Sequence, residues 1–334
     1  MRRFVSEISA LIIEEYGTTE YLGRLSDPLF FQSLSCATAM DWHSSGTTTT
    51  LTAAIKLGLT DLDLGVVCCG GKGKTSKKTP SEIERFSDNL NLSESKRNIL
   101  SKATKLTAKV DSSVIQDGYN LYHHSFLFDE KGNWCVIQQG MNPANHYARR
   151  YHWFNADRFV ASPPNKIAGS KEKETLNLSS NCSHDSRKVS LDLVKDNPNH
   201  LRKYFGGQTT LLDNHYALPA RHEIFKSDLS KKDWETLHNA YELQPKNYEE
   251  LVCLQGMGKK KLRALGLLAK LIHGTELDWR DPVKYSFAHG GKDGIPYPVD
   301  RSTYQNSISF LQDVLAETKS GEKSKALSRL AHLC

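Results

Sequence analysis

A short run with two glycines, Gly256-Met257-Gly258, limits the possible fold more than any other feature, because it separates two apolar patterns with helical spacing. The first pattern follows Asn247, and Glu250 stands three residues later, a combination typical of a capped helix start. The second pattern runs to Gly274, a residue that commonly ends helices because it adopts positive φ without strain. The spacing predicts two helices within 247–274, joined by a tight turn.

This segment resembles the helix-hairpin-helix family, in which Gly-apolar-Gly separates two helices and a small residue, here Ala264, follows six positions later. The resemblance implies binding to the DNA backbone, because the glycines let amides approach a phosphate and the second helix directs its positive end there. Such binding is independent of base sequence and weakens with salt. An ordinary helical hairpin, or one used for protein contacts, is the alternative. The expected DNA contacts are Gly256, Gly258, Lys259, Lys260, Lys261 and Arg263.

Length and periodicity indicate an α+β protein in two parts. The chain has 334 residues, of which 38% are hydrophobic, so two separate cores are possible. Residues 1–160 mix helical spacing with a β-hairpin over 121–139 and form the candidate catalytic domain. Residues 161–190 are rich in Ser, Asn and Lys, which suits a linker or a long surface loop. Residues 191–334 are mainly helical and contain the 247–274 module.

A strand is expected to lead into a loop rich in glycine and lysine, 70–80. Its Gly73-Lys74-Thr75 nearly completes the phosphate loop of a nucleotide-driven motor, but Cys68 stands where the first glycine belongs. The next helix also starts several residues too late for such a loop. We therefore prefer a flexible loop that contacts a nucleic-acid backbone. In this interpretation, Lys72 stabilises the phosphate that reacts, and Lys74 binds the DNA.

Polar side chains gather on or beside the predicted β-hairpin. Carboxylates are the ligands that Mg²⁺ or Mn²⁺ prefers, and a histidine can act as base in phosphodiester cleavage. The leading hypothesis is therefore metal-dependent hydrolysis of a DNA backbone. The predicted metal ligands are Asp41, Asp111 and Asp117, and the predicted catalytic residues are His43, Asp111, Asp117, His123 and Lys72.

Each of these polar residues also has a purely structural interpretation. His124 alternates with apolar residues along the predicted strand, which favours a hydrogen-bonded core histidine. Asp41 and Asp111 can simply cap a helix or a turn. Arg149 and Arg150 lie among aromatic residues, where they either contact DNA or belong to the core.

Several longer segments of the sequence are similar to those of a prokaryotic family catalogued only as a domain of unknown function. The resemblance covers most of the chain and implies one family unit with a nucleic-acid role, without a settled activity. One departure is Pro164-Asn165, where the family tends to carry Pro-His. The similar segments are residues 24–28, 41–46, 70–73, 109–111, 116–119, 121–124, 138–142, 149–153 and 285–294.

Charge and cysteine content limit the partners and the compartment. The net charge of +6 permits a polyanionic partner. No apolar run reaches the ~18 residues that span a bilayer, so we expect a cytoplasmic protein without a membrane partner. The seven cysteines include no Cys-x-x-Cys, which indicates reduced thiols rather than a zinc site.

Two functions from different classes remain open at this point. The first is a metal-dependent nuclease in DNA repair or processing. The second is a non-catalytic DNA-binding or adaptor protein of a repair complex, with repair proteins or a second copy of the chain as partners. The nuclease requires at least two carboxylates that converge within reach of one metal ion on the face that carries the lysine loop.

Overall fold

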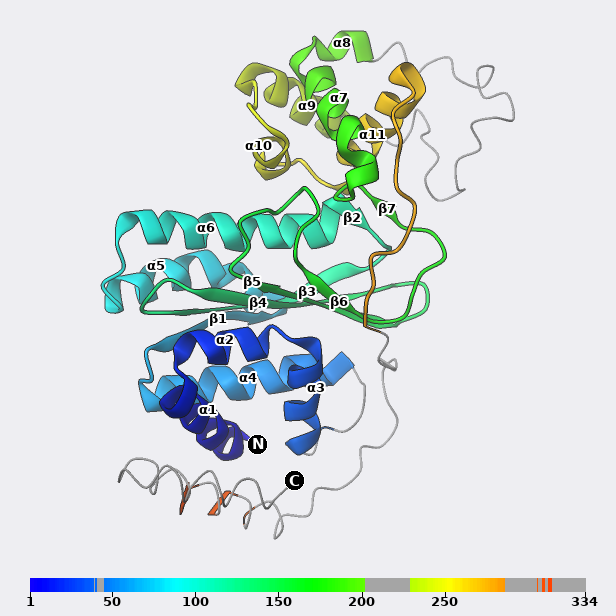
Figure 1. The fold of residues 1–334 in the computed structure, drawn as a ribbon. Coiled ribbons are helices and arrows are strands. Elements are labelled where there is room, and N and C mark those ends of the chain that lie inside the picture. Colours follow the sequence, from blue (N-terminus) through cyan, green and yellow to red (C-terminus); the bar gives the residue numbers. More distant parts are fainter. Residues whose placement is uncertain are drawn as a thin grey trace.

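A five-stranded antiparallel sheet in the order β1-β3-β4-β5-β6 forms the centre of the molecule, with helices on both faces (Figure 1). This computed structural model describes residues 1–38, 40, 45–201, 229–285, 305, 308–309 and 312–313. The predicted α+β class and the β-hairpin are confirmed. The strands are β1 (Val66–Lys72), β3 (Asn120–Asp129), β4 (Trp134–Met141), β5 (Ala148–Phe154) and β6 (Lys166–Ala168).

Four N-terminal helices cover one face of the sheet (Figure 1). The first ends at Tyr16, directly before Gly17, and the third is capped by the Asp27 carboxylate. Their apolar side chains pack on sheet residues such as Leu127 and Ile137, which alternate toward this face. The helices are α1 (Arg2–Tyr16), α2 (Thr18–Leu25), α3 (Pro28–Ala37) and α4 (Ser45–Leu62).

The other face of the sheet carries α6, with the C-terminal helices stacked beyond it (Figure 1). One cluster of buried side chains extends from Phe126 and Val136 of the sheet through Leu106 of α6 to Leu251 and Leu265. The sheet and the C-terminal helices therefore share a core. The helices are α5 (Thr79–Asn89), α6 (Glu94–Lys109), α7 (His184–Lys195), α8 (Pro198–Leu201), α9 (Lys231–Leu243), α10 (Tyr248–Cys253) and α11 (Lys259–His273).

The glycine- and lysine-rich segment is regular where the sequence predicted a flexible loop. Strand β1 continues through Lys72, a 3-10 helix, η1 (Gly73–Lys78), follows, and α5 begins directly at Thr79. Gly70 allows this because its φ is +80° and a side chain there would meet the backbone of strand β3. The glycines thus serve the packing of an edge strand.

Residues 161–190 contain more structure than the predicted linker or surface loop. They hold β6, β7 (Leu176–Asn177), the short helix η3 (Asn181–Ser183) and the start of α7. Strand β7 pairs with β2 (Ile115–Gln116), and its Leu176 is fully buried. The polar composition of the segment reflects its turns, in which Ser and Asn side chains bond to nearby backbone. The division of the chain into separate domains stays a prediction.

Within the part of the chain that the structure describes, no helix has the length and apolar character needed to cross a membrane. Six cysteines fall in this part, and all are free thiols. Burial raises the pKa of Cys68 to about 12, so this thiol stays protonated at neutral pH.

Candidate functional site

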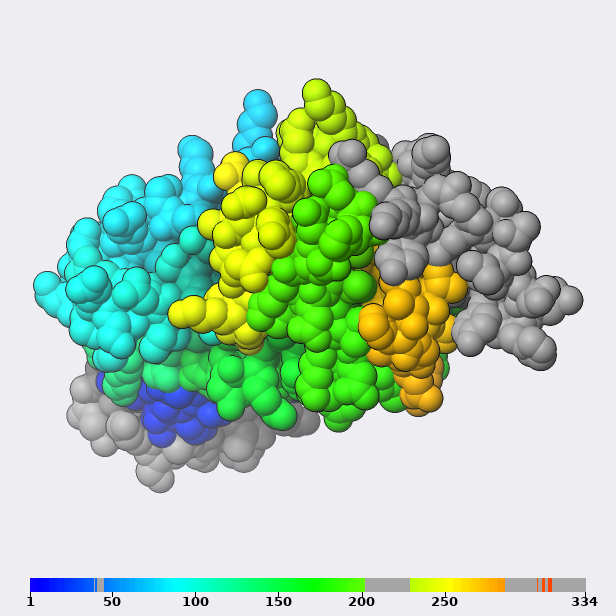
Figure 2. All heavy atoms as spheres, turned by 90° about the horizontal axis from the view of Figure 1, so that it is seen from above, coloured from blue at the N-terminus to red at the C-terminus, as the bar shows by residue number. Residues whose placement is uncertain are grey.

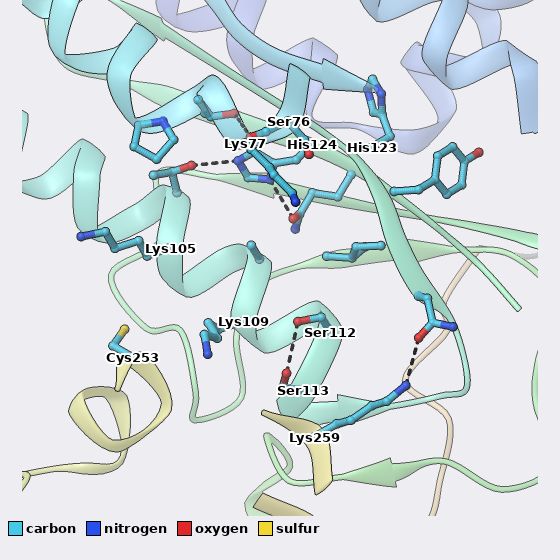
Figure 3. A pocket seen from close by; sticks show the side chains of 18 residues that line it. Ser76, Lys77, Lys105, Lys109, Ser112, Ser113, His123, His124, Cys253 and Lys259 are labelled. Carbon is cyan, nitrogen blue, oxygen red and sulfur yellow. Dashed lines mark hydrogen bonds between the residues drawn. The ribbon is translucent and has the colours of Figure 1, made fainter. Parts of the chain in front are cut away.

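A cavity of about 780 Å³ lies where the end of β3 meets η1, α6 and the connection from α10 to α11 (Figure 3). Four lysines from three elements line it: Lys77 of η1, Lys105 and Lys109 of α6, and Lys259 of α11. None of the described residues that line it is an Asp or a Glu. With neutral histidines, the lining therefore has a formal charge of +4 without a counter-charge, which suits an anionic ligand.

The two lysines with assigned hydrogen bonds are held by neutral acceptors. Lys109 donates to the backbone carbonyl of Met257, and Lys259 Nζ donates to Asn120 Oδ1 at 2.9 Å. Burial lowers the pKa of Lys109, and the charge of nearby Lys261 lowers it further. Because neutral acceptors do not cancel their charges, both ammonium groups can still attract an anion.

The predicted ligand contacts did not include Lys105 or Lys109, whereas Lys77 belongs to the lysine-rich loop that was predicted to contact a nucleic-acid backbone. A local signal for the two missed lysines exists, since Lys105 and Lys109 are four residues apart and so share one face of α6. No comparable signal links them to Lys77, which reaches the cavity only through the fold.

The start of α11 lies at the edge of this cavity. The two helices predicted within 247–274 are present: Asn247 caps α10, and α11 ends at Gly274 in the left-handed conformation. Gly256 has a φ of +82° in the turn between them. Gly258, the N-cap of α11, offers no side chain to the first amides of the helix. These amides and the positive end of the helix dipole are therefore available to a ligand.

The basic residues around this turn fall into two groups. Lys259 and Lys260 are exposed, and Arg263 is partly exposed beside a second, smaller cavity of about 120 Å³. Lys261, by contrast, is buried and forms an ion pair with Asp233 of α9. The DNA contact predicted for Lys261 does not fit this position, because its charge holds α11 to α9.

Seen from above, α10 lies beside the α5 and α6 layer (Figure 2).

Asp111 is completely buried in a π-helical turn, η2 (Val110–Val114), behind the cavity. Its carboxylate accepts hydrogen bonds from Trp153 Nε1 at 2.6 Å, Gln138 Nε2 at 2.7 Å and Asn165 Nδ2 at 3.0 Å. Burial raises the pKa of Asp111 to about 8 against the effect of these three donors. The sequence predicted a departure from the family pattern at Asn165, and this residue contacts Asp111 directly.

Asp117 belongs to a second buried network, centred on Arg149. The Arg149 guanidinium lies between Asp117, at 2.9 Å, and Asp281, at 2.6 Å, and all three side chains are at most 1% exposed. The Tyr151 hydroxyl donates to the same Asp117 oxygen at 2.6 Å. The surface contact with DNA predicted for Arg149 is incompatible with this burial.

Arg150 is also buried, but on the opposite face of the sheet. Its guanidinium lies 4.6 Å from the centre of the Phe31 ring, and its nearest assigned acceptors are Gln32 and Thr48. Burial without a described carboxylate partner lowers the pKa of Arg150 to about 9. The predicted DNA contact at this residue does not fit either, because the side chain is only 1% exposed.

His124 connects the cavity wall to Asp111 through a chain of hydrogen bonds. Thr104 Oγ1 lies 2.8 Å from His124 Nε2, and His124 Nδ1 lies 2.8 Å from Gln138 Oε1. Because the amide oxygen only accepts, Nδ1 carries the proton and Nε2 accepts from Thr104. Burial lowers the pKa of His124 to about 4. His124 is thus the neutral, hydrogen-bonded histidine that the alternation along the strand indicated.

His123 points to the opposite face of the sheet from His124. Its Nε2 lies 3.0 Å from both Thr52 Oγ1 and Ser125 Oγ, and Lys72 is its partner in the β1–β3 register. The structure therefore brings His123 and Lys72 together at the cavity end of the sheet. Lys74 is exposed nearby on η1.

The predicted metal ligands do not converge in the described residues. Asp111 and Asp117 each have both oxygens occupied by internal donors, so they do not fit as first ligands of Mg²⁺ or Mn²⁺. No cluster of three His, Cys, Asp or Glu that could hold a metal ion occurs among the residues that the structure describes. Asp41 and His43 lie outside the described residues, so their roles stay predictions.

We expect His124 to make the protein less stable as the pH falls from 6.5 to 4. Its pKa is about 4 when folded, against about 6.5 in an unfolded chain, so the unfolded chain takes up the proton first. The contribution of neutral His124 to the free energy of unfolding is fully present above about pH 6.5. It falls by about 1.4 kcal/mol per pH unit as the pH decreases from about 6.5 to about 4. Urea unfolding of the wild type and His124→Gln at several pH values measures this, and identical slopes would contradict it.

Together, these features define an α+β protein with a cationic cavity between its sheet and its C-terminal helices. The chain belongs to the family described as "Protein of unknown function (DUF763)", whose model matches residues 1–299. This match confirms the resemblance to a family catalogued only as a domain of unknown function, and the matched residues include the sheet, the cavity and the α10–α11 pair. No curated protein and no solved structure matches the chain.

Proposed function

We propose that this protein binds DNA through the sugar-phosphate backbone, without reading the base sequence. The observation that carries the proposal is the cavity with four lysines and no acidic residue in its described lining. Phosphates supply the missing negative charge, and contacts to phosphates carry no sequence information. We also propose that the protein acts in the cytoplasm.

The α10–α11 pair supports the proposal as a helix-hairpin-helix element. Met257, between the two glycines, is fully buried, and Ala264 is buried where a small residue lets the helices approach. The first amides of α11 have no side-chain cap, and Lys259 and Lys260 are exposed beside them. In this proposal, the amides and both lysines bind one stretch of phosphates.

The internal hydrogen bonds favour binding over metal-dependent cleavage. Asp111 and Asp117 are used inside the protein, where removal from their donors would leave several buried polar groups unpaired. We therefore place the protein in the DNA-binding or adaptor class. Repair proteins or a second copy of the chain remain the proposed partners.

Fluorescence anisotropy with labelled single-stranded and duplex DNA tests this function. We expect similar affinities for unrelated sequences and a steep loss of affinity between 50 and 200 mM salt, of roughly 10-fold or more. The double variant Lys259→Gln/Lys260→Gln should reduce the slope of log K against log salt by about 2 on duplex DNA. Absence of binding at the lower salt concentration would refute the proposal.

Lys96 and Lys131 provide a matched control, because they carry the same charges near the opposite end of β3. Lys96→Gln/Lys131→Gln should leave the slope unchanged. An equal loss in both double variants would mean that net charge alone causes the binding. Parallel incubations with Mg²⁺ and with EDTA should show no cleavage, and metal-dependent cleavage would restore the nuclease hypothesis.

A further inference from the structure

The size of the lysine cavity limits what can enter it. Its volume of about 780 Å³ falls within the range of roughly 300–1,000 Å³ typical of small-ligand pockets. A DNA duplex is far wider, since its major groove alone is about 12 Å across. A nucleotide at the end of a strand fits this space, whereas the middle of a duplex stays outside.

The charge of the cavity favours a phosphate monoester. An internal phosphodiester has one negative charge, whereas a terminal phosphate has about −1.5 to −2 at pH 7 and three acceptor oxygens. Lys77, Lys105, Lys109 and Lys259 supply four positive charges. A terminal phosphate therefore gains more from this lining than an internal one does.

Two serines on the cavity wall add a hydrogen-bond donor. The hydroxyls of Ser112 and Ser113 lie 3.2 Å apart, and only one of them can donate to the other. The remaining hydroxyl hydrogen is available to a ligand oxygen. Both serines line the cavity together with Lys109, so the donor and the ammonium group face the same space.

The cavity also has an apolar side that suits a base. Pro80, Ala108 and Leu121 line it. Contacts of a base with apolar and aromatic surfaces tolerate any sequence.

From this combination we infer that the cavity receives the phosphorylated end of a DNA strand, with the terminal phosphate among the lysines and the base of the last nucleotide against Ala108 and Leu121. The inference rests on the proposed DNA-binding function and names its substrate. Lys259 links the two, because it belongs both to the start of α11 and to the cavity. A strand held by α11 thus ends in the cavity.

The test compares one single-stranded oligonucleotide in three forms: with a 5′-phosphate, with a 3′-phosphate and with hydroxyl groups at both ends. We expect one phosphorylated form to bind about tenfold more tightly than the hydroxyl form at equal salt, as one extra charge-assisted contact provides. Equal affinities for all three forms would overturn the inference. Absence of binding by every form would instead refute the proposed function.

Variants locate the preference. Lys77 and Lys105 are exposed, so Lys77→Gln/Lys105→Gln should fold normally and bind all three forms with the same affinity. Lys260→Gln, at α11 outside the cavity lining, should weaken all forms equally and keep the preference. A preference that survives the first variant would overturn the inference. Competition with free dAMP distinguishes a DNA end from a free nucleotide as the ligand. We expect dAMP to compete only weakly. Displacement by dAMP as effective as that by the phosphorylated strand would overturn the inference and show that the cavity binds free nucleotides.

Discussion

Replacement of Arg149 by methionine is expected to lower the free energy of unfolding by about 3–5 kcal/mol, because Asp117 and Asp281 would both lose their buried counter-ion. Two carboxylates without solvent or a cation repel each other and keep their full desolvation cost. Arg149 also donates to the carbonyl of Ser170 at 2.5 Å, and this acceptor would lose its partner as well.

Urea denaturation measures the loss, with Arg158→Met as the matched control. The Arg158 side chain is 66% exposed beside Asp157, so its replacement should change the stability by no more than about 0.5 kcal/mol. If Arg149→Met does not fold, Arg149→Lys keeps the charge and removes the planar fork, and should show an intermediate loss. Similar small losses in all variants would show that the network contributes little.

Replacement of Gly70 by alanine should have an effect of comparable size, about 3–5 kcal/mol. At its φ of +80°, an added Cβ would lie 2.2 Å from the backbone oxygen of His124 and 2.4 Å from Thr79 Oγ1. The backbone oxygen cannot move without breaking the register of β1 on β3. The substitution therefore displaces the strand that leads into η1 and its lysines.

Gly73 provides the control within the same segment. Its φ is +59°, but an added Cβ there would meet no atom within 4 Å. Gly73→Ala should thus cost only the about 1–2 kcal/mol of a left-handed alanine. Thermal or urea unfolding of both variants decides the matter: equal losses would mean that the backbone angle, rather than the contact with β3, requires glycine at position 70.

Features that depend on nearby residues could be predicted from the sequence. The β-hairpin pairs strands across a short turn, and the caps at Asn247 and Gly274 act within a few residues. Likewise, the alternation along β3 placed His124 on the buried side. Each of these features follows from local stereochemistry, which the sequence records directly.

The roles of the buried carboxylates could not be predicted in this way. Asp111 takes its donors from 27, 42 and 54 residues further along the chain, at Gln138, Trp153 and Asn165. An aspartate that binds a metal and one that accepts internal donors look the same in a sequence. The lysine cavity could not be predicted for a similar reason. Its lysines come from η1, α6 and α11, and only the fold brings these elements together.

The Arg149 network also has a consequence for folding during synthesis of the chain. Its two carboxylates lie on either side of the arginine, and Asp281 follows Arg149 by 132 residues. At a synthesis rate of about 5–20 residues per second, Asp281 leaves the ribosome roughly 7–26 s after Arg149. Until then Asp117 is the only carboxylate among the described residues that pairs with the guanidinium, so we expect the nascent sheet to reach its final stability only after the segment that follows α11 has been translated.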